Sequence, residues 1–241
     1  MRFRRSLKYL FFIGFIGFLS FLYSFTSIRN GVKKIAEVRV SFQVNKSNFL
    51  THTMVNKLLI QNNKTVINQP KSVIDLYSLE KKVSENPYVE KAAVFLTIDG
   101  VLKSKIKQRV PVARIIGGKT SYYIDKQGVK VPLSENYSAR VLLVSGVESA
   151  ADIRLVLPLI SVILEDDFLQ KEVVGILKSD DGAFQFSVRS GDYKVDFGNL
   201  ERVKTKFSML KAFYNTTFKN KTIQDYKRIT LKYHNQVVCT K

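Results

Sequence analysis

An uninterrupted apolar run near the N-terminus is the strongest pattern in the chain. Residues 9–28 hold no charged side chain and contain six phenylalanines. A helix of twenty residues, rising about 1.5 Å per residue, spans roughly the 30 Å hydrocarbon core of a bilayer. The run exceeds the usual signal-peptide h-region of about 7 to 15 residues, and no A-x-A-like cleavage site follows. We therefore predict a transmembrane helix at 9–28. The short tail 1–8 carries only positive charges, which places the N-terminus in the cytoplasm.

Beyond the span, helical and strand periodicities alternate. A β-rich stretch at 35–44 precedes helical spacing at 53–61, and a second helix starts after the N-cap Asp75 and ends at Asn86-Pro87. Two alternating strands follow, joined by Asp99-Gly100 as a two-residue hairpin turn. Their predicted inward positions are Val94, Leu96, Ile98, Leu102, Ile106 and Val110. We predict an α+β protein with a β-α-α-β-β domain at 29–111 and a mostly antiparallel β-domain with flanking helices at 112–241.

Strand-like alternation returns in residues 226–241. One face of this predicted strand carries Ile229, Leu231, Tyr233, Asn235, Val237 and Cys239. A chain that stops on a strand leaves that strand either inside a sheet or at an edge that can accept another chain. We expect the second case, which is a binding site. Tyr233 either contacts a partner or belongs to the core, because it shares a face with Ile229 and Leu231.

Composition bounds the chemistry. The chain is 45% hydrophobic and 24% charged, which is typical of a globular protein, and its single cysteine excludes an internal disulfide framework. The net charge is +19, and 35 Lys and Arg still face 20 acids once the four basic residues of the tail are set aside. Such an excess favours anionic lipid or an acidic partner. For a domain outside the cytoplasm, we expect no nucleic-acid partner.

A row of positive charges marks a second candidate surface. Lys103, Lys105, Lys107 and Arg109 alternate with apolar or polar residues, so all four lie on one face of the predicted return strand. Lysines in such a row protect a strand edge from aggregation, or they bind an acidic partner or anionic lipid near the membrane.

The residues of catalysis do not come together in the sequence. His234 and Cys239 are five apart, which sends their side chains to opposite faces of a strand. Glu165, Asp166 and Asp167 are typical of a solvated helix end. We predict a protein that is not an enzyme and needs no cofactor or metal.

Several segments together resemble the FtsQ/DivIB family of bacterial cell-division proteins, which carry a polypeptide-transport-associated (POTRA) domain. The similar segments, in chain order, are Asn86-Pro87-Tyr88-Val89, Ala92-Ala93-Val94, Arg109-Val110-Pro111-Val112-Ala113, Tyr122-Tyr123-Ile124-Asp125, Phe197-Gly198, the helix around Leu200 to Phe213, and the closing strand around Tyr233. Gln108 stands where many members carry an acid. The short basic tail and the end at Lys241 are more similar to FtsQ than to DivIB.

The resemblance implies a non-enzymatic, single-pass scaffold of the division machinery. It implies an inner-membrane protein with periplasmic domains, concentrated at the division site, that binds FtsB- and FtsL-like coiled-coil proteins and other divisome components and helps to regulate septal peptidoglycan synthesis. The expected partner-binding residues are Leu231, Lys232, Tyr233, Asn235, Gln236 and Val237. The alternative is a membrane-anchored basic module that binds anionic lipid or an envelope polymer.

Overall fold

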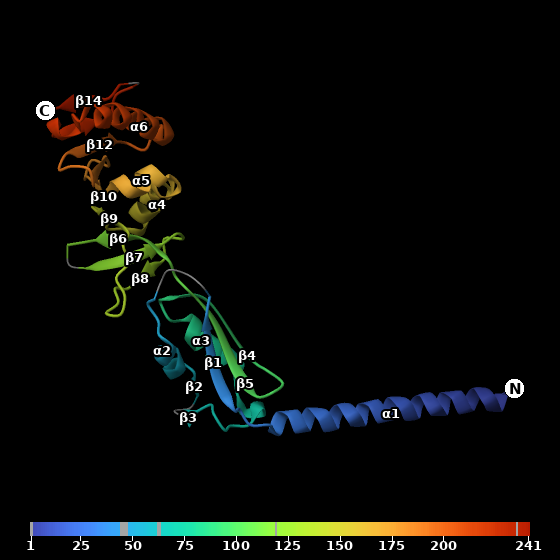
Figure 1. Cartoon of the computed structure of the whole chain (residues 1–241). Coiled ribbons are helices and arrows are strands. Elements are labelled where there is room, and N and C mark those ends of the chain that lie inside the picture. Colours follow the sequence, from blue (N-terminus) through green and yellow to red (C-terminus); the bar gives the residue numbers. More distant parts are fainter. Residues whose placement is uncertain (1, 44–47, 62–63, 119, 235) are drawn as a thin grey trace. The chain divides into compact units, whose positions relative to one another are not determined.

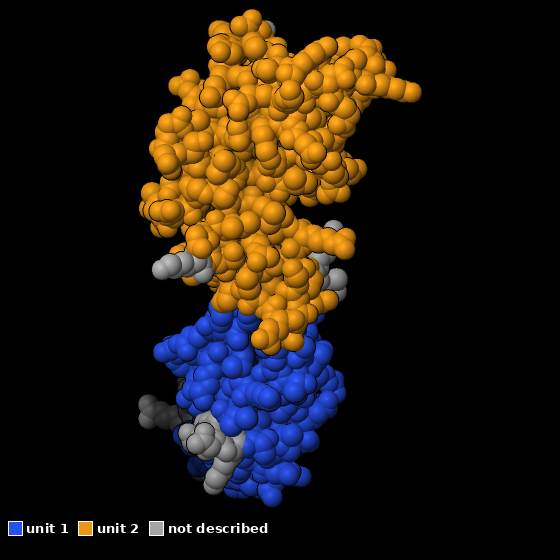
Figure 2. Space-filling model, turned by 90° about the vertical axis from the view of Figure 1, so that its left-hand side faces the viewer, with its two compact units in different colours: residues 1–45, 50–108 blue, residues 46–49, 109–241 orange. Residues whose placement is uncertain are grey.

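The protein contains one long helix and two compact units. The computed structural model describes residues 2–43, 48–61, 64–118, 120–234 and 236–241 (Figure 1). The first unit comprises residues 1–45 and 50–108, and the second comprises 46–49 and 109–241 (Figure 2). The α+β class is confirmed, because each unit contains a sheet and helices, and the first unit begins with the long apolar helix.

Helix α1 (Arg2–Val32) is longer at both ends than the predicted span. Its segment Leu10–Val32 is 23 residues long and contains an 18-residue window with a mean hydropathy of 1.8, none of which is buried inside the protein. A helix that is apolar all round and uncovered by protein fits a bilayer. The helix continues past Ile28 to Val32, through a segment that contains Asn30 and Gly31 but no proline.

The first unit follows the predicted β-α-α-β-β order. Its elements are β1 (Glu37–Phe42), α2 (His52–Leu58), the short strands β2 (Ile60–Gln61) and β3 (Lys64–Thr65), the 3-10 turn η1 (Lys71–Val73), α3 (Leu76–Ser84), β4 (Val89–Leu96) and β5 (Val101–Gln108). Asp75 caps α3, because its Oδ1 accepts a 3.0 Å hydrogen bond from the Ser78 backbone N–H. The sheet order is β1-β5-β4, which puts β5 in the centre.

The turn between β4 and β5 differs from the prediction. Strand β4 ends at Leu96, and residues 98–100 form the turn, closed by a 3.0 Å bond from Thr97 N–H to the Val101 carbonyl. Ile98 is therefore not on an inward face but 82% exposed at the turn. Val110, also predicted inward, is 41% exposed because β5 ends at Gln108. Gly100 is required: its φ is +88°, and a Cβ would lie 2.7 Å from the Lys34 carbonyl oxygen.

The second unit contains a nine-stranded sheet in the order β14-β13-β12-β11-β10-β9-β6-β7-β8. Its elements are β6 (Pro111–Ile116), β7 (Ser121–Asp125), β8 (Lys130–Val131), β9 (Leu142–Ser145), α4 (Ala150–Glu165), α5 (Asp167–Glu172), β10 (Val173–Lys178), β11 (Phe184–Val188), β12 (Lys194–Gly198), α6 (Val203–Asn220), the 3-10 turn η2 (Ile223–Asp225), β13 (Arg228–Thr230) and β14 (Val238–Thr240). Five neighbouring pairs are antiparallel and three are parallel, so the predicted mostly antiparallel sheet is confirmed.

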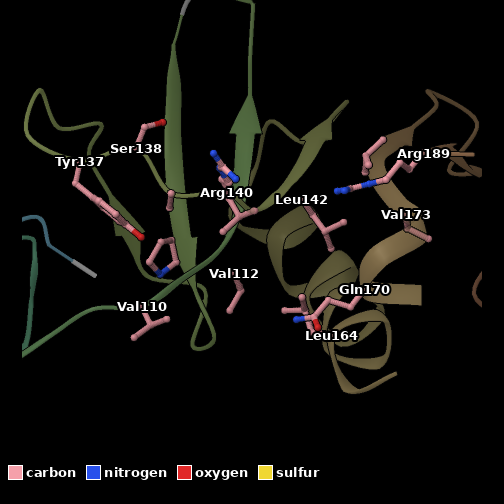
Figure 3. A pocket seen from close by; sticks show the side chains of 14 residues that line it. Val110, Val112, Tyr137, Ser138, Arg140, Leu142, Leu164, Gln170, Val173 and Arg189 are labelled. Atoms are coloured by element: carbon pink, nitrogen blue, oxygen red, sulfur yellow. The ribbon is translucent and has the colours of Figure 1, made fainter. Parts of the chain in front are cut away.

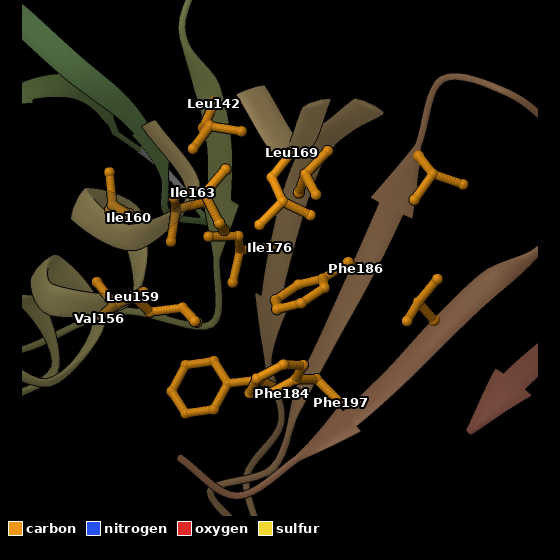
Figure 4. Packing of buried hydrophobic residues seen from close by; sticks show 14 of the residues in the cluster. Leu142, Val156, Leu159, Ile160, Ile163, Leu169, Ile176, Phe184, Phe186 and Phe197 are labelled. Carbon is orange, nitrogen blue, oxygen red and sulfur yellow. The ribbon is translucent and has the colours of Figure 1, made fainter. Parts of the chain in front are cut away.

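The core of the second unit lies between this sheet and its helices (Figure 4). Apolar side chains of α4, such as Ile160 and Ile163, are buried with those of the strands. The rings of Phe186, Phe197 and Phe207 are in mutual contact, with centroid distances of 4.9 Å (Phe186–Phe197), 5.8 Å (Phe186–Phe207) and 5.0 Å (Phe197–Phe207). This aromatic cluster joins β11, β12 and α6, and it supports the side of the sheet on which the last two strands are added.

Candidate partner-docking edge

The C-terminal segment is a hairpin, so the prediction of one continuous strand over 226–241 is wrong. Strands β13 and β14 run antiparallel, with Ile229 opposite Cys239 and Thr230 opposite Val238. Residues 231–237 connect them. Strand β13 lies parallel to β12, and β14 ends the nine-stranded sheet. The last strand therefore does have a hairpin partner, but its other edge pairs with no strand in the described part of the chain.

Two contacts end β13 and direct the chain into the connection. The Leu231 backbone N–H donates a 2.8 Å hydrogen bond to the Asp196 carbonyl, and the Leu231 side chain is fully buried. Lys232 then passes over Gly198, where a Cβ would lie 2.8 Å from the Lys232 Cγ. The alternation expected from the sequence holds as far as Leu231, fails at the exposed Tyr233, and returns with the half-buried Val237 and Cys239.

The predicted partner-binding residues have different surroundings. Lys232 and Gln236 are exposed, and Tyr233 is 52% exposed within the connection rather than in the core. Leu231 is buried, and Val237 is half-buried against the core. Leu231 is therefore a support for the edge and not a contact surface in this conformation. Asn235 lies outside the described residues.

Strand β14 is short and presents two kinds of side chain. Val238 is 40% exposed, whereas Cys239 packs partly against the core. Burial raises the pKa of the Cys239 thiol, which lowers its thiolate fraction. His234 Nδ1 lies 2.8 Å from Arg202 Nη1, so His234 and Cys239 have separate partners. The free edge can pair with a backbone, and Val238 can contact a side chain of the added strand.

A largely buried chain of polar side chains joins α5 to α6. Ser190 Oγ donates to the Glu172 carboxylate and lies 2.5 Å from the Tyr193 hydroxyl, which donates a 3.0 Å bond to the Tyr214 hydroxyl. Burial raises the pKa of Tyr193 and, more strongly, of Tyr214, so both phenols stay protonated. This chain links α5, the segment before β12 and α6.

Asp166, in the acidic run 165–167, has a structural role at the start of α5. Asp166 accepts 3.1 Å bonds from the Phe168 and Leu169 backbone N–H groups and forms a 2.6 Å ion pair with Lys211 of α6. The Lys211 hydrogen bond is the largest cause that lowers the pKa of Asp166. Asp166 is thus a helix cap tied to α6.

Positive charge surrounds the hairpin. Residues 226–241 contain four basic side chains and no acid, and all four are exposed: Lys227, Arg228, Lys232 and Lys241. Asp196 partly offsets this charge, because its carboxylate lies 3.5 Å from Arg228 Nε. Such a surface favours a partner segment with acidic residues beside its β-strand.

The second predicted surface is on the central strand of the first unit. Strand β5 is paired on both sides, so the edge-protection interpretation of its lysines is wrong. Lys103 and Lys105 lie on the face opposite the buried Leu102 and Ile106. Lys107 forms a 2.7 Å ion pair with Glu90.

Arg109 does not belong to this row. It lies in the second unit and forms a 2.6 Å ion pair with the buried carboxylate of Asp125. The pair joins the start of β6 to the end of β7, which is a structural role. The second surface therefore consists of the three lysines of β5.

Sequence reasoning missed a hollow of about 770 Å³ in the second unit (Figure 3). Val112, Leu142 and Val173 give it an apolar floor, and Arg140 and Arg189 are exposed at its wall. The lining comes from several segments that are distant in the chain, so no local sequence pattern predicts this hollow. In the described part of the chain, no group of three or more His, Cys, Asp or Glu residues could hold a metal ion.

The fold defines a membrane-anchored protein with a POTRA-like unit followed by an α+β unit. A family model for POTRA-like domains matches residues 36–107, and a model described as FtsQ/DivIB, C-terminal related, matches residues 110–240. Because the second match covers more than half of the chain, the protein belongs to the FtsQ/DivIB-related family. This family is one of non-enzymatic division scaffolds, and the resemblance predicted from the sequence is confirmed. A search of curated proteins found no match.

Proposed function

We propose that the protein is a bitopic scaffold of the bacterial divisome that binds an FtsB-like partner at β14. The observation that carries this proposal is the outer edge of β14 at the end of the nine-stranded sheet, which pairs with no strand among the residues that the structure describes. An extended partner segment adds a tenth strand there, with backbone hydrogen bonds supplying affinity. An FtsL-like protein joins through its coiled coil with the FtsB-like partner, and the assembly helps to regulate septal peptidoglycan synthesis.

Side chains beside the β14 edge fix the register of the added partner strand and select its charge. Lys232, Tyr233 and Gln236 are exposed in the connection, and Val238 is exposed on the strand. A matching partner has an apolar residue opposite Val238 and acidic residues near Lys232. Asn235 and Val237 stay in the predicted contact set.

In this proposal the two units of the chain have different roles. We assign partner binding to 112–241 and recruitment to the division site to 29–111, with 9–28 in the inner membrane and 1–8 in the cytoplasm. The lysines of β5 provide a second surface for an acidic divisome component, because helices bury the opposite face of the sheet, whereas Lys105 is exposed and Lys103 is only half-buried.

A titration with modified peptides tests the proposal directly. The membrane-distal tail of the FtsB-like protein of the same host is synthesised in two forms. Each form carries N-methyl groups on every second residue, and the residues methylated in one form are those left unmethylated in the other. One form loses the N–H groups that face β14, and the other loses those that face solvent. We expect the first to lose binding at least tenfold relative to the second, measured with the full chain in nanodiscs. Equal affinities, or no binding of the unmodified peptide at tens of micromolar, would contradict strand addition.

Truncation after Gln236 gives a second test, because it removes Val237 and all of β14. We expect peptide binding to be lost while the first unit keeps its unfolding transition. Tyr233→Ala, which leaves the edge intact, separates a side-chain contribution from the backbone contribution.

A further inference from the structure

The end of α1 is hydrogen-bonded to the turn between β4 and β5. Lys71 Nζ donates to the Asn30 side chain at 2.9 Å and to the Ile98 carbonyl at 3.0 Å. Lys33 Nζ donates to the same carbonyl at 3.2 Å. The Ala36 backbone N–H adds a 2.9 Å bond to the Gly100 carbonyl. The turn is therefore held beside the residues in which the apolar helix ends.

The length of the helix gives the depth of this turn. The segment Leu10–Val32 has 23 residues and is about 34 Å long at 1.5 Å per residue, a few ångströms longer than the roughly 30 Å hydrocarbon core. Asn30 to Val32 therefore reach the headgroup layer when Leu10 enters at the other side. Ile98 shares that depth, because Lys71 joins its carbonyl directly to Asn30.

The side chains at this level are apolar and exposed. Ile98 is 82% exposed, Val32 is 66% exposed and Val73 of η1 is 58% exposed. Apolar side chains beside lysines at the end of a membrane span are typical of an interfacial anchor. The Ile98 carbonyl, which insertion would remove from water, already accepts from two ammonium groups.

We propose that the turn 97–100 and η1 contact the bilayer surface. Ile98 and Val73 enter the boundary between headgroups and acyl chains. Each lysine ammonium has three donors, so Lys33 and Lys71 keep donors for lipid phosphates. The contact adds a second attachment to the one made by α1 and limits the tilt of the first unit on the membrane. This inference goes beyond the proposed partner binding and does not depend on it.

The absence of tryptophan from the chain makes a direct measurement possible. The full-length Ile98→Trp variant is reconstituted into phosphatidylcholine vesicles that contain a fraction of lipid with brominated acyl chains. Glu85→Trp is the matched control. Its side chain is 65% exposed, and it precedes β4, whose eight residues put about 26 Å between it and the turn.

We expect blue-shifted emission and several-fold stronger bromine quenching for Ile98→Trp than for Glu85→Trp. Equal, weak quenching of both variants would overturn the proposal. Strong quenching of both would also overturn it, because the unit would then lie on the bilayer without a specific contact at the turn.

The role of the lysines is tested in the Ile98→Trp background. Lys71→Met removes the bonds to Asn30 and to the Ile98 carbonyl, and we expect quenching to fall at least twofold. Lys91→Met, the matched control, removes an exposed ammonium from β4 and is expected to leave quenching unchanged. Equal quenching in the Lys71 and Lys91 variants would contradict the assignment of Lys71. Peptide titration of the same proteoliposomes reports separately on β14, so the two proposals fail independently.

Discussion

The hairpins β4–β5 and β13–β14 use the same antiparallel pairing in different structural settings. Seven residue pairs join β4 to β5 through a short turn, and β5 is then covered on its other side by β1. Only three pairs join β13 to β14, the connection is seven residues long, and β14 remains at the edge. The first hairpin is therefore an internal part of its sheet. The second has few bonds of its own and is available to an added strand.

The largest expected effect comes from the side chains that hold each hairpin to its core. Leu102 of β5 and Leu231 after β13 are both fully buried. Replacing either by Ala should lower the free energy of unfolding by about 2 to 5 kcal/mol. Denaturant unfolding should show the loss in the first unit for Leu102→Ala and in the second for Leu231→Ala. Tyr233→Ala, at an exposed position, should change it by less than about 0.5 kcal/mol.

The two glycines that adjoin the hairpins should respond unequally. Both have positive φ, but a Cβ at Gly100 meets the Lys34 backbone oxygen, whereas a Cβ at Gly198 meets the flexible Lys232 side chain. We expect Gly100→Ala to cost about 2 to 3 kcal/mol and Gly198→Ala about 1 kcal/mol, measured by thermal unfolding. Combining Lys232→Ala with Gly198→Ala should restore part of the lost stability, whereas combining it with Gly100→Ala should restore none.

Hydrogen exchange should separate the hairpins without any substitution. The β14 amides are expected to exchange at least about tenfold faster than those of β5, because few tertiary contacts hold an edge strand of three residues. A bound partner peptide should slow β14 and leave β5 unchanged. Comparable protection in the free protein would mean that β14 is as firmly held as an internal strand.

The smallest expected effect concerns pH and the support of the second unit. The pKa of Asp166 is lowered in the folded protein, chiefly by Lys211. Its contribution is therefore present above the unfolded pKa of about 4 and is lost as the pH falls through the folded pKa. Both side chains are partly exposed, so the loss should be under about 1 kcal/mol. Asp166→Asn should remove that part of the acid dependence, measured as unfolding free energy against pH.

Local patterns predicted most elements of the first unit. The N-cap at Asp75, the stop at Asn86-Pro87 and the buried Leu102 and Ile106 follow from backbone sterics and strand alternation. Ile98 was misplaced because the turn begins one residue earlier than Asp99-Gly100 suggests. Turn boundaries depend on hydrogen bonds across the pair of strands, which a single strand does not show.

The terminal segment shows where local patterns fail. Ile229 and Leu231 alternate as predicted, but the polar run His234-Asn235-Gln236 is a turn signal between two apolar runs. That signal was available and would have predicted a hairpin. No local signal predicts the pairing of β13 with β12, because these strands are separated by α6 and join only through tertiary packing.

The sequence by itself determined the apolar span, the family and the β-α-α-β-β order of the first unit, because hydrophobic periodicity, caps and turn residues act over a few neighbours. Only the tertiary structure decided that the lysines of β5 lie on a central strand, that Arg109 pairs with Asp125, that Tyr233 leaves the core and that β14 ends the sheet. The physical reason is that strand order depends on hydrogen bonds and packing between segments far apart in the chain. The same alternating pattern therefore fits an internal strand or a free edge.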